Sequence, residues 1–286
     1  MAKRRDQLAR IAQDALAIEQ EEAQKAGTLG YMARVLVQTT MPHTDPKKPV
    51  FKRQNGNFRL SMVAADGLPY GRYPRLLLAW VTTAATRTKT PRLDLGPSLS
   101  SFMAELGVVP TGGRWGTIHR LRRQIKRLFS SSISCTLDDP KGGTYQDAGF
   151  RVAQRMELWW DAKAPEQAAI FGSHVDLTEE FFRSITDRPV PVDIRALRAL
   201  RAPLALDIYT WLTYRNSYLQ KRVTIPWEAL ELQFGSDYHR TRDFKAAFLK
   251  HLEAVVTVYP DARISEGTKG LILKPSPPHV KRLKAL

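Results

Sequence analysis

The sequence has a single cysteine, Cys135, among its 286 residues. One thiol excludes an intrachain disulfide and a zinc site built from thiolates, so we expect Cys135 to be a small buried residue. No apolar run approaches the ~20 residues of a membrane-spanning helix, and the N-terminus lacks the apolar stretch of a signal peptide. These absences predict a protein of a reducing cytoplasm and argue against a membrane partner.

Acidic residues are also scarce. The chain has 28 Asp and Glu against 44 Lys and Arg, a formal net charge of +16. Such an excess predicts a polyanionic partner, most simply nucleic acid. The length exceeds that of a usual single domain, and 43% hydrophobic residues suffice for packed cores. We therefore expect two domains of about 100–150 residues each.

Acids are absent from Arg114 to Thr136, and residues 114–128 (RWGTIHRLRRQIKRL) carry six positive charges. Helical spacing places Ile118, Leu121, Ile125 and Leu128 on one apolar stripe. The other face has no acid at i±3 or i±4 to act as a counterion, so we predict that it binds the phosphates and base edges of DNA. The predicted DNA-binding residues here are Arg114, Gly116, His119, Arg120, Arg123, Lys126 and Arg127.

The segments around this helix have the order of a winged helix–turn–helix. Upstream we expect strands at 31–40 and 57–64, joined by a Pro- and Lys-rich loop. The expected elements are then a buried helix from Pro74, a strand at 92–95, a helix from Ser98 to Gly107, a turn at 110–113, the basic helix, and strands at 133–137 and 150–159. In this motif the third helix enters the major groove and the hairpin, or wing, reaches the backbone. We predict that Lys141, in the hairpin loop at 138–147, makes the wing contact.

The second half repeats this order. We expect helices at 202–219, 226–235 and 239–252 and strands at 222–225, 255–259 and 271–274. A shift of 128 residues places Gly107 on Gly235. Its predicted DNA-binding residues are His239, Arg242, Asp243 and Lys250, with wing contacts from Arg263 and Lys269; an aspartate can accept a hydrogen bond from cytosine N4.

The sequence thus predicts an α+β protein with two tandem winged helix–turn–helix domains. We expect an N-terminal helical arm at 1–27 and the first domain at 28–160. A connecting segment at 161–192, with a short helix from Leu177 to Ile185 capped by Thr178, leads to the second domain at 193–286.

Enzymatic functions fit the sequence poorly. The segment Gly107–Arg114 has no Lys-Ser/Thr after its glycines and so is not a phosphate loop. His119 and Arg122 form the H-x-x-R of tyrosine recombinases, but later tyrosines fall in core or strand contexts, and the histidines never pair as a nickase metal site requires. We expect no catalytic residue, metal or cofactor, and a recombinase would reveal itself by a covalent bond between a tyrosine and DNA.

Residues 67–132 carry a family resemblance. The segments GLPYGRYPRLLLAWVTT and RTKTPRLDLGPSLSSFMAELGVVPTGGRWGTIHRLRRQIKRLFSSSIS resemble the plasmid-encoded RepA replication initiator family. The upstream LGYMARVLVQTTMPH and NGNFRLSM look similar to its N-terminal part, so the resemblance is specific over about residues 28–135. RVTIPWEALELQFG and DFKAAFLKHLEAV are similar in pattern to the C-terminal winged helix of iteron-binding plasmid initiators. Ala84 departs from the acidic residue expected after Thr83.

The resemblance implies a bacterial, plasmid-associated protein that binds repeated origin sites, called iterons, in double-stranded DNA. Such proteins promote opening of an adjacent AT-rich duplex and recruit host replication proteins such as helicase and initiator, without catalysis of their own. Relatives switch between a monomer and a homodimer through the N-terminal domain. A winged-helix transcriptional repressor with no replication role remains the alternative, because it needs the same DNA recognition.

Overall fold

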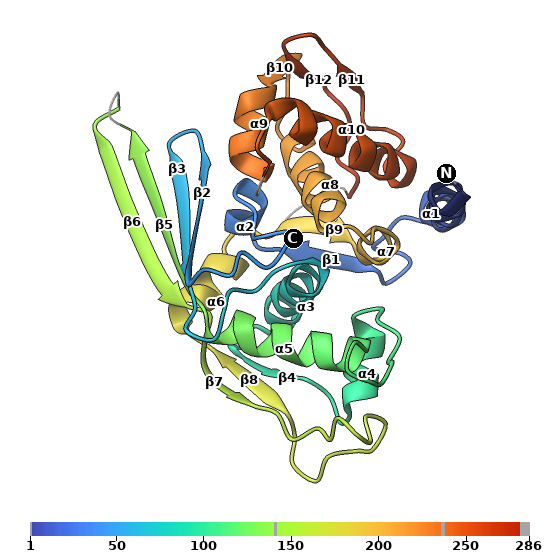
Figure 1. The fold of residues 1–286 in the computed structure, drawn as a ribbon, viewed down its shortest axis with the longest axis vertical. Helices are drawn as coiled ribbons and strands as arrows, with labels where there is room; N and C mark the ends of the chain where they lie inside the picture. Colours follow the sequence, from blue (N-terminus) through green and yellow to red (C-terminus); the bar gives the residue numbers. More distant parts are fainter. Residues whose placement is uncertain (1, 140–141, 236–237, 281–286) are drawn as a thin grey trace.

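The computed structural model describes residues 2–139, 142–235 and 238–280 and combines α-helices with antiparallel sheets (Figure 1). Two groups of elements, which we call the first and second modules, lie one below the other in this view. The two-stranded sheet of β1 (Leu29–Met32) and β9 (Val190–Asp193) lies between them. Residues 29–32 therefore pair with a segment about 160 positions later, with Leu29 opposite Asp193.

The first module contains three helices and a three-stranded sheet. Its elements are α3 (Arg72–Thr88), β4 (Arg92–Asp94), α4 (Leu99–Glu105), α5 (Thr117–Ser130), β7 (Ala153–Glu157) and β8 (His174–Leu177). The strand order is β4-β8-β7, so the last strand is central. Helix α4 begins at Ser98, whose hydroxyl accepts a hydrogen bond from the Ser101 N–H at 3.1 Å, as the sequence predicts.

The second module repeats this arrangement. Its elements are α8 (Pro203–Asn216), β10 (Val223–Pro226), α9 (Trp227–Phe234), α10 (Thr241–Val258), β11 (Ile264–Glu266) and β12 (Gly270–Leu273). The strand order β10-β12-β11 again places the last strand in the centre. Both halves therefore share the same order of elements and the same strand order.

The long hairpin after α5 belongs to a different sheet from the one expected. Strands β5 (Ser132–Asp139) and β6 (Thr144–Arg151) join β2 (Val50–Asn55) and β3 (Phe58–Val63) in the order β2-β3-β5-β6. This sheet rises beside α9 (Figure 1). The assignment of residues 138–147 as the wing loop is therefore wrong, because the hairpin that follows α5 in the β4 sheet is β7–β8. Lys141 itself lies outside the described residues.

Two further expectations about local structure are wrong. The expected strand at 31–40 is short and gives way to α2 (Arg34–Gln38), where Leu36 and Val37 are buried on one side. The expected strand at 255–259 is instead the end of α10, where Val255 and Val258 pack into the core. In both places β-branched composition favours a strand, but burial of one helical face decides the structure.

The remaining helices connect these parts. Helix α1 (Ala2–Gln20) packs against α7 (Ile194–Ala199) and α10 and buries Ile11 and Ile18, so the expected N-terminal arm is a docked helix. Helix α6 (Glu179–Thr186) begins at Thr178, as predicted. Both β8 and β9, from the expected connecting segment, are paired in sheets. Every helix in the described residues is too short or too polar to cross a membrane.

Candidate nucleic-acid interface

Helix α5 has the two faces that its sequence predicts. Ile118, Leu121, Ile125 and Leu128 are buried in the hydrophobic core. Gln124 is buried with them, and its Oε1 accepts a hydrogen bond from the Tyr70 N–H at 2.9 Å, which anchors the helix to the turn before α3. This polar anchor escaped the sequence analysis because a glutamine on an apolar face has no partner within its own helix.

A cross-braced turn holds the start of α5. The Thr111 N–H donates to Thr117 Oγ1 at 2.8 Å, and the Thr117 N–H donates to Thr111 Oγ1 at 2.9 Å. Thr117 Oγ1 also donates to Val109 O at 2.7 Å. These reciprocal bonds fix the connection between α4 and α5.

Gly116 is part of this turn and does not lie on the exposed face of α5. It is buried, and a Cβ there would come within 2.2 Å of the carbonyl oxygens of Thr111 and Gly112. Its assignment as a DNA contact is therefore corrected: the backbone packing of the turn requires glycine at this position.

Five of the seven predicted residues on and before α5 are exposed, and none of the five has an ion pair within the described residues. They are Arg114, His119, Arg120, Arg123 and Lys126. Arg120 also lies over the Tyr73 ring, 5.8 Å from its centroid. The exposed face of α5 is thus cationic and polar, as expected of a surface that meets phosphate.

Arg127 is the exception on this helix. Its side chain is only 16% exposed, and Nη1 lies 3.1 Å from Asp45 Oδ2 and 3.2 Å from the carbonyl oxygen of Leu68. Partial burial works to raise the pKa of Asp45, but hydrogen bonds from the Lys47 N–H and from Arg127 bring it below its usual value. Arg127 is neutralised inside the protein by an acid distant in sequence, so it leaves the candidate interface.

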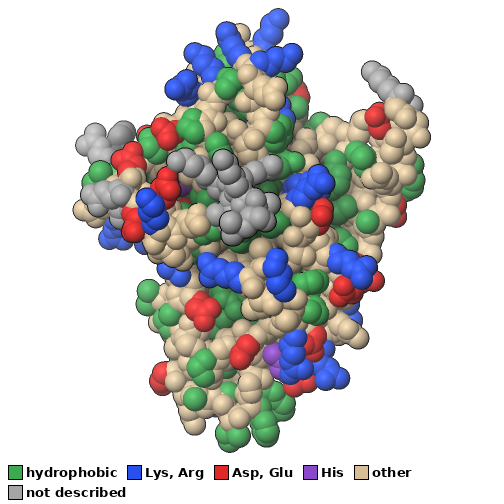
Figure 2. Space-filling view, turned by 180° about the vertical axis from the view of Figure 1, so that it is seen from behind, with side chains coloured by type: hydrophobic (Ala, Val, Ile, Leu, Met, Phe, Trp, Pro, Cys, Tyr) green, Lys and Arg blue, Asp and Glu red, His purple; other side chains and the backbone are tan. Residues whose placement is uncertain are grey.

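The predicted residues of the second module lie on the surface. His239, Arg242, Asp243 and Lys250 are exposed on and just before α10, and Arg263 and Lys269 are exposed at the β11–β12 hairpin. Figure 2 shows Lys and Arg gathered at the tip of this module, over the β10–β12 sheet, whereas charges of both signs alternate over the rest of that face. Arg242 Nε lies 3.8 Å from Asp243 Oδ1, a loose pair between exposed side chains.

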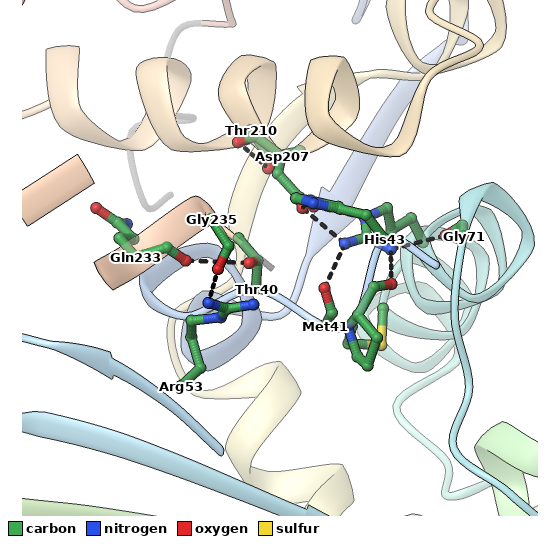
Figure 3. Close-up of polar contacts among 11 residues, drawn as sticks. Thr40, Met41, His43, Arg53, Gly71, Asp207, Thr210, Gln233 and Gly235 are labelled. Atoms are coloured by element: carbon green, nitrogen blue, oxygen red, sulfur yellow. Dashed lines mark hydrogen bonds and ion pairs between the residues drawn. The ribbon is translucent and has the colours of Figure 1, made fainter. Parts of the chain in front are cut away.

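A buried polar contact joins the two modules (Figure 3). Arg75 of α3 forms a bidentate pair with Asp207 of α8, with Nε–Oδ1 at 2.6 Å and Nη2–Oδ2 at 2.7 Å. His43 Nε2 lies 2.7 Å from Asp207 Oδ2. The other guanidinium N–H groups donate to the carbonyl oxygens of Met41, Pro42 and Gly71, so all five donors are used. We call Arg75, Asp207 and His43 the inter-module lock.

The charges in the lock follow from its burial. Burial works to raise the pKa of Asp207, but the Arg75 charge and the hydrogen bonds from His43 and Arg75 hold it below its usual value. Burial lowers the pKa of His43, so this imidazole is neutral at pH 7 and donates from Nε2.

A second contact lies beside the lock (Figure 3). Thr40 Oγ1 donates to Gln233 O at 3.0 Å, and Arg53 donates to the Gly235 carbonyl. Gln233 Nε2 also donates to Gln38 O at 3.0 Å. These bonds join α2 and β2 to α9. The two candidate DNA-binding surfaces therefore belong to one tightly joined body.

Two side-chain features bear on metal and thiol chemistry. The described side chains contain no group of three or more His, Cys, Asp or Glu that could hold a metal ion. Cys135 is buried as expected, and burial raises the pKa of its thiol to about 12. A thiol in this state is a poor nucleophile at neutral pH.

With this geometry in view, the comparisons with known proteins identify the family. Residues 68–229, more than half of the chain, match the family of plasmid encoded RepA proteins. The chain belongs to the plasmid-encoded RepA replication initiator family. The matched segment runs from the turn before α3 to the start of α9 and includes α5 and the lock residues Arg75 and Asp207.

Two solved structures are similar in fold over a longer part of this RepA family member than the family match covers. A crystal structure of selenomethionine-labelled domains 2 and 3 of RctB is similar with a TM-score of 0.51 and 12% identity, covering 84% of this chain and 98% of that one. A second structure of RctB domains 2–3 gives a TM-score of 0.50 and 11% identity, covering 84% and 96%. At such identities the similarity concerns the fold alone. No curated protein matches the sequence.

Proposed function

We propose that this RepA family member is a plasmid replication initiator that binds iterons in double-stranded DNA through two winged-helix domains and has no catalytic step of its own. The observation that carries the proposal is the exposed face of α5. Arg120, Arg123 and Lys126 face solvent there, on a helix whose other side is fixed in the core. A rigid basic helix of this kind suits the major groove, where arginine can bind guanine through two hydrogen bonds.

The repeated arrangement of the modules supports two DNA contacts. In each module a helix–turn–helix precedes a hairpin that pairs with the module's first strand, as in winged helices, and α5 and α10 hold the position of the reading helix. The β7–β8 and β11–β12 hairpins would then be the wings. Both helices would meet one duplex because the lock joins the modules.

Family membership and the resemblance described above support the later steps of the proposed function. After binding iterons, the protein would promote opening of an adjacent AT-rich duplex and recruit host helicase and initiator proteins. A repressor that lacks these steps would share the DNA-binding surface, so it is separated by experiment.

An open sheet edge supports an equilibrium between monomer and homodimer. Strand β6 is the outer strand of its sheet, and most of its residues are exposed. The Val152 N–H donates to Ser131 O at 3.0 Å, and bonded pairs alternate along antiparallel strands. The N–H groups of Tyr145, Asp147 and Gly149 therefore point away from β5, and no described residue bonds them, so they could pair with the same strand of a second copy.

Salt dependence of DNA binding tests the electrostatic part of the proposal. The cations offered are Arg114, Arg120, Arg123 and Lys126 on and before α5 and Arg242 and Lys250 on α10. If each neutralises one phosphate, log K should fall with log[salt] with a slope of about −5. Footprinting on the plasmid's own origin region should show protected repeats. A slope near zero, or no protected repeat, would refute the proposal.

A replication assay separates the initiator from the repressor. A plasmid that carries only the minimal origin should replicate in a host that expresses this protein and fail in a host that lacks it. Replication in both hosts, together with intact binding to the repeats, would favour the repressor.

A further inference from the structure

Trp115 is the most exposed of the six tryptophans, with 75% of its surface in contact with solvent. It lies two residues before Thr117, the first residue of α5, and Val109, at the other end of the turn between α4 and α5, is 77% exposed. Trp160, Trp211 and Trp227 are buried by contrast. An aromatic side chain of this size, exposed beside Val109 and next to a candidate DNA-binding helix, is suited to contact a partner.

The turn holds Trp115 in place. The reciprocal hydrogen bonds between Thr111 and Thr117 close the turn on both sides of it, and the Gly116 N–H donates to Gly113 O at 3.0 Å. The backbone that carries the indole is therefore ordered before any partner binds, which lowers the entropy cost of using it as a contact.

The charges around Trp115 indicate that its binding partner is a polyanion. The Arg114 guanidinium lies 5.3 Å from the centroid of the indole ring. The exposed cations Arg120 and Arg123 follow on α5, and this stretch of sequence contains no acid. A second copy of the chain placed on this surface would bring like charges together across the twofold axis. An aromatic ring among cations is the combination that binds nucleic-acid bases and their phosphates.

We propose that Trp115 stacks on an unpaired base of the bound DNA while Arg114 binds a neighbouring phosphate. Both faces of a base are covered by its neighbours in an intact duplex, so the indole can stack only where a step is opened or unstacked. Trp115 would therefore favour opened DNA over paired DNA within the same footprint. This inference rests on the proposed function, because it requires DNA on α5.

Two duplexes test it: an origin repeat that is fully paired, and the same repeat with a short mismatched bubble at the position nearest Trp115. Trp115→Ala should weaken binding to the bubble duplex by about 5- to 150-fold, the range that alanine substitution of a stacking aromatic gives. It should weaken binding to the paired duplex far less. Trp115→Phe, which keeps a ring, should remain close to wild type. Tyr218→Ala removes another exposed aromatic, 47% exposed just after α8, and should change neither affinity.

Three results would overturn the inference. The first is a Trp115→Ala protein that binds the bubble duplex as tightly as wild type. The second is an equal loss on both duplexes, which would make Trp115 a contact to paired DNA. The third is a Trp115→Ala protein whose mass without DNA, measured by ultracentrifugation, differs from that of wild type at the same concentration, which would make Trp115 a protein contact. Wild-type protein that binds neither duplex would refute the proposed function itself, and this inference with it.

Discussion

Asp207→Asn tests whether the lock holds the two modules together. The substitution keeps the shape of the side chain but removes its charge and one acceptor oxygen. In the wild-type protein Asp207 accepts three hydrogen bonds, two from Arg75 and one from His43. An asparagine amide nitrogen would face one or two of these donors, so at least one bond is replaced by an approach of donor to donor.

The expected cost follows from what remains buried. The Arg75 side chain is 3% exposed, so its charge would lose its counterion in a site that water barely reaches. Breaking a buried ion pair by removing one partner costs about 3–5 kcal/mol of unfolding free energy. This is a large share of the about 5–15 kcal/mol by which folded domains are stable.

Urea unfolding followed by tryptophan fluorescence and circular dichroism measures this cost. Asp187→Asn is the matched control, because Asp187 is 68% exposed and lies 4.0 Å from Arg188, a surface pair worth about 0–1 kcal/mol. The Asp207 variant should lose at least 3 kcal/mol more than the control. A loss below about 1 kcal/mol, or one equal to that of the control, would refute the view that this contact stabilises the junction.

Three further predictions concern the interface, the sheet edge and pH. Arg123→Ala should weaken DNA binding and reduce the salt slope by about 1 without changing the melting temperature. Arg127→Ala should lower the melting temperature, because it breaks the partly buried pair with Asp45. Equal melting temperatures for the two variants would contradict these different roles. Gly149→Pro should abolish self-association measured by ultracentrifugation and keep the fold, while Gly149→Ala, which retains the N–H, should associate like wild type. Burial lowers the pKa of His43, so the unfolded chain takes up the proton more readily, and the free energy of unfolding should fall as the pH drops below about 6.5. In urea titrations at several pH values, His43→Gln should flatten this fall. An unchanged profile would exclude His43 as its source.

The parts of the fold that the sequence predicts are those with local signals. Helix α5 carries its own apolar period and its own lack of acids, so its position, its buried face and most of its exposed face could be read directly. The Ser98 and Thr178 caps are equally local, since each hydroxyl bonds an N–H three residues later. The repeated order of elements was visible because both halves have similar spacing between apolar segments.

The parts of the fold that the sequence does not predict depend on residues that are distant in the chain. Strand β2 lies in a Pro- and Lys-rich stretch and becomes a strand by pairing with β3, while β3 and β5 pair residues about 75 positions apart. The inward turn of Arg127 depends on Asp45, which lies 82 positions earlier. No period or spacing within either segment records these partners.

The lock is an intermediate case, because a signal for it was present. Arg75 and Asp207 are charged residues in α3 and α8, the two described helices that bury the most residues. A charge in a helix buried nearly all round needs a buried partner. That rule predicts that each residue has a counterion, but which residues pair follows only from how α3 and α8 pack.

The same Asp207→Asn substitution also tests whether the lock sets the relative placement of the two candidate reading helices on DNA. Arg75 lies on α3, which packs against α5, and Asp207 lies on α8, which packs against α10. Each candidate reading helix is therefore one packing layer from the lock. Two rigidly joined modules present their second contact at a high effective concentration once the first has bound. At a temperature where the Asp207→Asn protein is still folded, its affinity for a full repeat should fall towards that of a half repeat, and its footprint should shorten. Wild-type affinity and a full footprint would show that the contacts of Thr40, Gln233 and Arg53 suffice to set the placement of the two helices.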